Sequence, residues 1–151
     1  MARFKDVQGR DWDVVVDVVA IKQVRSALSV DLAKLFESEA KKVFGDPCLL
    51  VDVLFVLCRD QCEGRKLSDI DFGRSLGGDS LKLAGKALAD AVIDFFPSDQ
   101  QAPCRELLAK DEAIRTAALT QVLEHAKQID PTKVVEQMKA KQPTQSESPT
   151  N

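Results

Sequence analysis

The chain has 151 residues, of which 44% are apolar and 30% are charged, as expected for a soluble folded domain and not for a disordered or membrane protein. Its 21 lysines and arginines against 24 aspartates and glutamates give a net charge of −3, which excludes nucleic-acid binding by bulk positive charge. With one histidine and no tyrosine, the chain has few of the side chains that transfer protons at neutral pH, and no enzyme activity is expected.

The first predicted element is a small β-hairpin within residues 3–16. Apolar and polar residues alternate on either side of Gly9, whose freedom to take a positive φ angle suits a tight turn. Because a lone two-stranded hairpin is only marginally stable in water, we expect Phe4 and Trp12 to pack it against the helices that follow.

Two helices are predicted after the hairpin. Asp17 has the side chain of an N-cap, and apolar residues at helical spacing follow it over residues 18–28. A second helix begins at Ser29 or Asp31 and ends at Gly45. Its apolar stripe comprises Leu32, Leu35, Phe36, Ala40, Val43 and Phe44.

The third predicted helix is the most apolar one. It begins with Asp46 as N-cap and Pro47 in the first turn, and it reaches about Cys62. Since it is apolar on nearly all sides, we expect it at the centre of the domain. Ser68 and Asp71 then form a capping box that opens a short helix, with aspartate in the place of the usual glutamate.

Two long helices are predicted next. Asp79 is expected to cap a helix that ends before Pro97. Residues 98–103 are expected to form a polar link, and a further helix runs from there to about Gln128.

The chain is predicted to end in a short helix over residues 131–140, which begins after Asp130, and a polar tail. The tail, residues 142–151, has no apolar area to bury and is expected to be disordered. The sequence thus predicts a mainly α fold, with an N-terminal β-hairpin packed on a multi-helix bundle as one domain over residues 1–141.

The cysteines do not form a metal-binding pattern. Cys58 and Cys62 are four residues apart, on one face of a helix, but a structural zinc site needs a second pair of ligands. The remaining candidates are scattered along the chain: Cys48, Cys104 and His125. We therefore expect no metal and no cofactor, and we expect the cysteines to behave as small buried apolar side chains.

No segment is predicted to enter a membrane. The most apolar run, residues 48–58, contains Asp52 and is shorter than the roughly 18–20 residues that span a bilayer. The first six residues show no apolar segment of a secretory signal. We expect a cytoplasmic protein, in which cysteines remain thiols.

Neither His125 nor the glycines of residues 73–78 form a known catalytic or phosphate-binding motif. His125 has no cysteine or serine at a recognisable motif spacing and is expected to be a solvated helix residue. The glycines lack the spacing of a phosphate-binding loop and do not follow a strand, so they indicate a helix end and a turn.

Residues 76–81, Leu-Gly-Gly-Asp-Ser-Leu, resemble the phosphopantetheine attachment site of acyl and peptidyl carrier proteins. That resemblance implies a modified hydroxyl on Ser80. The rest of the chain departs from a carrier, because a hairpin and two helices precede the motif. Lys82 and Lys86 also follow Ser80 where carriers usually present acidic residues.

The order of elements over residues 3–140 resembles the tail assembly chaperones of phages and prophages. Four features carry the resemblance: an N-terminal Phe-x-Asp-x-x-Gly-Arg-x-Trp hairpin, an apolar central helix that begins with Asp-Pro, a Phe-Gly-Arg segment, and a helix ending in Asp-Phe-Phe-Pro. Here these are Phe4, Asp6, Gly9, Arg10 and Trp12, then residues 46–58, then residues 71–74, then residues 94–97.

The resemblance implies a non-catalytic role. Such chaperones bind the tape-measure protein before the tail tube polymerises around it. In several phages a longer form, made by ribosomal frameshifting, recruits the tail-tube subunit, and the present chain would be the short form. Its compartment would be the cytoplasm of the host cell.

Two apolar surfaces are candidates for binding such a partner. One is the stripe of the second helix, with Leu32, Leu35 and Phe36, and the other is the last helix, with Val134, Val135 and Met138. Both also fit ordinary core packing. Three functions remain open from the sequence: an assembly chaperone, a helical interaction protein of another kind, and a carrier domain modified at Ser80.

Overall fold

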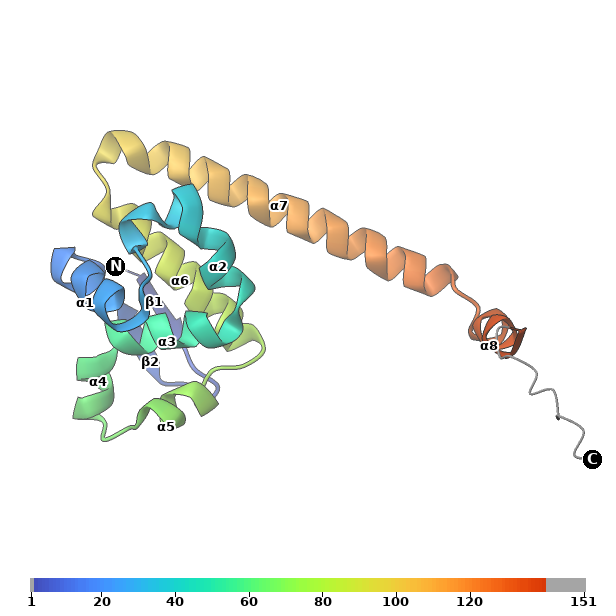
Figure 1. Ribbon diagram of the computed structural model, residues 1–151, viewed down its shortest axis with the longest axis horizontal. Coiled ribbons are helices and arrows are strands. Elements are labelled where there is room, and N and C mark those ends of the chain that lie inside the picture. The colour runs from blue at the N-terminus through green and yellow to red at the C-terminus, as the bar shows by residue number, and fades with distance from the viewer. Residues whose placement is uncertain (1, 141–151) are drawn as a thin grey trace, which may run out of the picture. The chain divides into compact units, whose positions relative to one another are not determined.

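A computed structural model describes residues 2–140 (Figure 1). It confirms the mainly α fold with an N-terminal β-hairpin. The predicted disordered tail, residues 142–151, lies outside the described residues. The chain divides into two compact units, Met1–Glu106 and Leu107–Asn151, and each is described by itself. The single domain over residues 1–141 stays a prediction.

The hairpin pairs β1 (Ala2–Lys5) with β2 (Asp11–Val14) in antiparallel register, with Phe4 opposite Trp12. One face of the hairpin is buried, and both aromatic side chains lie on it as predicted. The turn contains Gly9 at a φ of +81°, which a residue with a side chain rarely adopts.

Helix α1 (Val18–Leu28) has the predicted bounds. The Asp17 carboxylate accepts the backbone N–H of Ala20 and caps the first turn. The helix ends at Ser29, which takes the left-handed conformation and donates its N–H to the Arg25 carbonyl.

The prediction of one continuous helix from Ser29 or Asp31 to Gly45 is wrong. The segment consists of a 3₁₀ turn, η1 (Leu32–Lys34), a π turn, η2 (Leu35–Glu39), and a short helix, α2 (Ala40–Gly45). Residues three apart eclipse one another in a 3₁₀ turn, so Leu32 and Leu35 both point into the core.

Helix α3 (Pro47–Leu57) is the predicted central helix, and it contacts α1, α2, α5 and α6 (Figure 1). The Asp46 carboxylate caps it by accepting the N–H groups of Cys48 and Leu49. The helix is interrupted at Cys58, and α4 (Arg59–Gly64) continues from there, which corrects the prediction of one helix to Cys62.

Helix α5 (Asp69–Arg74) begins with the predicted capping box: the Ser68 hydroxyl accepts the N–H of Asp71, whose carboxylate accepts the N–H of Ser68. Helix α6 (Asp79–Phe95) differs from the prediction at its start. Its N-cap is Gly78, at a φ of +55°. Asp79 is instead the first residue of the helix, and no side-chain hydrogen bond caps this end.

Helix α6 contacts both strands of the hairpin and α3. The core of the first unit lies among these elements. Its largest fully buried side chains are Trp12, Phe72, Leu32, Leu35, Leu54, Leu88, Ile93, Val14, Val24, Val30, Val43 and Val53.

Helix α7 (Ser98–Gln128) begins earlier than predicted, so the expected polar link at residues 98–103 is wrong. The carbonyl of Pro97 accepts the N–H groups of Gln100 and Gln101, and the Gln101 side chain donates to the Phe96 carbonyl. These bonds start the helix directly after Pro97. Proline at position 103 therefore lies inside it.

Within the first unit, Arg105 attaches the start of α7 to α6. Its guanidinium lies 2.7 Å from the Asp94 carboxylate and 3.5 Å from that of Asp90. The second unit continues with the rest of α7 and with α8 (Pro131–Ala140), as predicted for the last helix. No helix among residues 2–140 has both the length and the apolar character that crossing a membrane requires.

Candidate partner-binding surface

The first predicted partner surface is not exposed. Leu32 and Leu35 are fully buried, and Phe36 is partly buried against the core. The turns η1 and η2 direct these side chains inward. Leu32 and Leu35 therefore expose no surface to a partner in this structure and instead hold the first unit together.

The second predicted surface is exposed. Val134, Val135 and Met138 have exposed fractions of 36%, 50% and 67%. Met138 follows Val134 by four positions and Val135 by three, so the three side chains lie on one face of α8. They form an apolar face of α8 that no element among residues 2–140 covers, which we call the α8 face.

A neighbouring apolar stripe lies on the second half of α7. Its residues recur at helical spacing and lie on one side of the helix: Ala118, Leu119, Val122, Leu123 and Ala126. The larger three are 54–64% exposed. We call this set the α7 stripe.

The α7 stripe is not evident as a partner surface from the sequence, because apolar residues at helical spacing are usually core. A signal was present just before the stripe in the same helix. There Asp111 and Arg115 occupy the same side as Val122 and form an ion pair of 3.0 Å between their side chains. A side that carries such a pair is poorly suited to an internal core.

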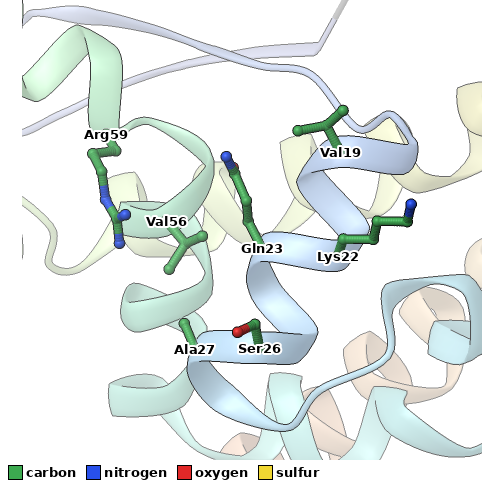
Figure 2. A pocket seen from close by; sticks show the side chains of 7 residues that line it. All are labelled: Val19, Lys22, Gln23, Ser26, Ala27, Val56 and Arg59. Carbon is green, nitrogen blue, oxygen red and sulfur yellow. The ribbon is translucent and has the colours of Figure 1, made fainter.

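The first unit has a groove between α1 and the α3–α4 junction, with a volume of about 350 Å³. Figure 2 shows the side chains that line it. They come mostly from α1 and comprise Val19, Lys22, Gln23, Ser26, Ala27, Val56 and Arg59. Next to it, Val18 in the first turn of α1 is 55% exposed.

The serine of residues 76–81, the segment that resembles a carrier-protein attachment site, points inward. Ser80 is buried, with 8% of its surface exposed. Its hydroxyl accepts the N–H of Gly77 at 2.9 Å and donates to the carbonyl of the same residue at 2.8 Å. Both hydrogen-bonding roles of the hydroxyl are therefore used within the turn that precedes α6.

The cysteines lie apart from one another except for Cys58 and Cys62, which are buried thiols as predicted, whereas Cys48 is exposed and Cys104 partly exposed. Burial, together with the neighbouring Cys62, raises the pKa of the Cys58 thiol to about 12. His125 is exposed on α7. Among residues 2–140, no three histidine, cysteine or acidic side chains gather closely enough to hold a metal ion.

The buried carboxylate of Asp6 is the centre of a closed hydrogen-bond network. It accepts Nε1–H of Trp12 at 3.0 Å, Nε–H of Arg10 at 2.7 Å, and the backbone N–H groups of Gln8 and Arg10. Burial alone raises the pKa of this carboxyl, but the four hydrogen bonds outweigh it and lower the pKa to about 2. The network orients the hairpin turn.

Comparison with protein-family models, with characterised proteins and with solved structures gives no match.

Proposed function

We propose that the chain is a non-catalytic tail assembly chaperone, which binds the tape-measure protein in the host cytoplasm before the tail tube polymerises. The four sequence features that resemble this family support the assignment. The longer, frameshifted form of the same family would recruit the tail-tube subunit, and the short form would supply the binding of the tape-measure protein alone.

One observation carries the proposal: every residue from 109 to 139 is exposed, although this segment contains the α7 stripe and the α8 face. Apolar side chains on an exposed helix lose contact with water only when another surface covers them. A helical apolar segment of a partner provides such a surface, because its side chains interdigitate with those of a facing helix.

Recognition through these residues depends on apolar burial more than on charge. The α8 face has valine and methionine side chains, and methionine adapts its shape to different partners. Burial of apolar area gives a negative heat-capacity change on binding and a weak dependence on salt.

The test is isothermal titration of the full chain with tape-measure fragments at two temperatures and two salt concentrations. The double variant Val135→Asp/Met138→Asp is expected to weaken binding by about a hundredfold, since it places two carboxylates in the apolar interface. Lys133→Asp puts a carboxylate on the other side of α8 and is the matched control. Absence of binding to every fragment, or equal effects of the variants, contradicts the proposal.

A further inference from the structure

The groove in the first unit is lined by two basic, two polar and three apolar side chains, with the basic ones at its two sides. Figure 2 shows Arg59 of α4 at one side and Lys22 of α1 at the other. Val56 and Gln23 lie between them, and Ala27 lies farther along α1; Val56 is buried, whereas Gln23 and Ala27 are exposed. We call this feature the α1–α4 groove.

The two cations of the groove have no acidic partner among the described residues. The guanidinium of Arg59 lies over an aromatic ring, 6.0 Å from the centre of the Phe55 ring. By contrast, Arg25 on the same helix as Lys22 is paired with Asp31 at 2.8 Å. The groove lining contains no carboxylate, so its only charges are the two positive ones of Lys22 and Arg59.

The apolar part of the groove extends onto the surface of α1. Val19 is 60% exposed and Val18, in the same turn, is 55% exposed. Such a surface is too open to enclose a small ligand, but it has the length of two helical turns. Helices α1 and α3 contact one another along the groove, which gives a third helix a preformed place to pack.

We infer that the α1–α4 groove is a second docking site, which takes an acidic amphipathic helix of a partner protein. The partner's apolar side chains would pack on Val19 and Ala27, which are exposed, and carboxylates on its two flanks would pair with Lys22 and Arg59. This charge complementarity selects an acidic helix over a neutral or a basic one. The inference does not rest on the tape-measure assignment, because the groove contains no residue of α7 or α8.

The probe is a synthetic amphipathic helical peptide with leucines on one face and glutamates on both flanks. A matched peptide has lysines in place of the glutamates. Each is titrated into the full chain, and backbone amide NMR shifts locate the site. We expect the acidic peptide to bind, to shift the amides of Val19, Gln23 and Arg59, and to bind more weakly as salt increases.

The double variant Lys22→Glu/Arg59→Glu is expected to weaken binding of the acidic peptide by about tenfold and to strengthen binding of the basic one. Both substitutions are at exposed positions. Lys82→Glu/Lys86→Glu on α6 makes the same change of net charge away from the groove and is the control.

Three results would overturn the inference: no binding of the acidic peptide, the same loss in both charge variants, or shifts confined to α7 and α8. The outcome is separate from that of the proposed function. Val135→Asp/Met138→Asp is expected to leave binding of the acidic peptide unchanged, even if it abolishes binding of the tape-measure protein.

Discussion

The side-chain amide of Gln61 pairs with the backbone of Asp13 as a neighbouring strand would. Its Nε2 donates to the Asp13 carbonyl at 2.8 Å, and its Oε1 accepts the Asp13 N–H at 3.0 Å. The next outward carbonyl of β2, that of Asp11, accepts Nη2–H of Arg65 at 2.6 Å. Helix α4 and the residue after it thereby occupy three backbone groups on the outer edge of β2, which would otherwise be open to another chain.

The first prediction concerns this edge. Gln61→Leu leaves the Asp13 N–H without a partner in a partly buried place and leaves the Asp13 carbonyl with only the weak Cys58 thiol donor, at 3.7 Å. It is expected to lower the free energy of unfolding by about 1–3 kcal/mol. Urea denaturation measures the loss, and hydrogen exchange of the Asp13 amide should become faster. Gln8→Leu, at an exposed turn position, is the control. An unchanged Asp13 exchange rate would contradict the role of Gln61.

Local sequence signals predicted the parts of the fold that local chemistry determines. Asp17, Asp46 and the Ser68–Asp71 pair cap helices as expected, because their short side chains reach nearby backbone N–H groups. The Gln61–Asp13 pairing was not predictable in this way, since the two residues are 48 positions apart and no local pattern connects them.

Local sequence patterns also fail to predict which apolar residues form the candidate partner surface. Leu32 and Val135 are both apolar residues at helical spacing, and the sequence does not distinguish them, yet Leu32 is fully buried and Val135 is half exposed. What separates them is the presence of covering elements in the first unit. The break at Cys58 and the succession of a 3₁₀ turn and a π turn after Asp31 were likewise not predicted from the local sequence pattern.

The second prediction is a pH dependence that comes from Asp6. Its carboxyl pKa is about 2 in the folded chain, against an ordinary value of 3.8. A lowered pKa in the folded state contributes stability that is complete above the ordinary pKa and is lost as the pH falls from there through about 2. The contribution is about 2 kcal/mol for this side chain, which is fully buried.

Asp6→Asn should remove that dependence. It keeps the size of the side chain but removes the charge, and its amide nitrogen faces the donors Arg10 and Trp12. Urea denaturation of both forms between pH 2 and pH 7 is expected to give the largest stability difference above about pH 4, with the two curves converging toward pH 2. Parallel curves over this range would show that Asp6 is not the group that titrates.

The third prediction concerns Trp12, which is fully buried. Its ring meets Phe72 edge-on at 5.0 Å between centroids, and the Arg65 guanidinium lies 4.3 Å from its centroid. Trp12→Ala is expected to cost about 3–5 kcal/mol in unfolding free energy, because it opens a cavity between the hairpin and the helices. Thermal denaturation measures this loss, and an unchanged melting temperature would mean that the hairpin is not part of the core.

Trp12→Phe separates packing from hydrogen bonding. It retains an aromatic ring but removes the indole N–H that Asp6 accepts. We expect a smaller loss of stability than in the alanine variant, together with a raised pKa of the Asp6 carboxyl. A loss equal to that of Trp12→Ala would assign the stabilisation to the hydrogen bond and not to the ring.

The fourth prediction is a graded reactivity of the thiols. Cys48 is exposed, whereas Cys58 is fully buried with a pKa of about 12. Because the thiolate is the reactive form, alkylation at pH 7.5 is expected to modify Cys48 first and to leave Cys58 and Cys62 unmodified until the chain unfolds. Peptide mass spectrometry after a time course of iodoacetamide identifies the order. Modification of Cys58 in the folded chain at the rate of Cys48 would contradict the burial of this pair.

The fifth prediction distinguishes the chaperone from a carrier domain. A phosphopantetheinyl transferase needs a serine hydroxyl that is free and accessible, and the Ser80 hydroxyl is buried and bonded twice to Gly77. Exposing it requires opening the turn at Gly78, whose φ of +55° begins α6. Incubation with a broad-range transferase and coenzyme A is therefore expected to leave the intact mass unchanged.

Ser80→Ala supplies the second half of this test. Since the hydroxyl closes the turn before α6, its removal is expected to lower the unfolding free energy by about 1 kcal/mol, as a structural hydrogen bond would. A serine kept for modification would instead tolerate alanine with no change in stability. A stoichiometric gain of mass on the native chain that disappears in Ser80→Ala would assign the motif to a carrier and remove the chaperone proposal.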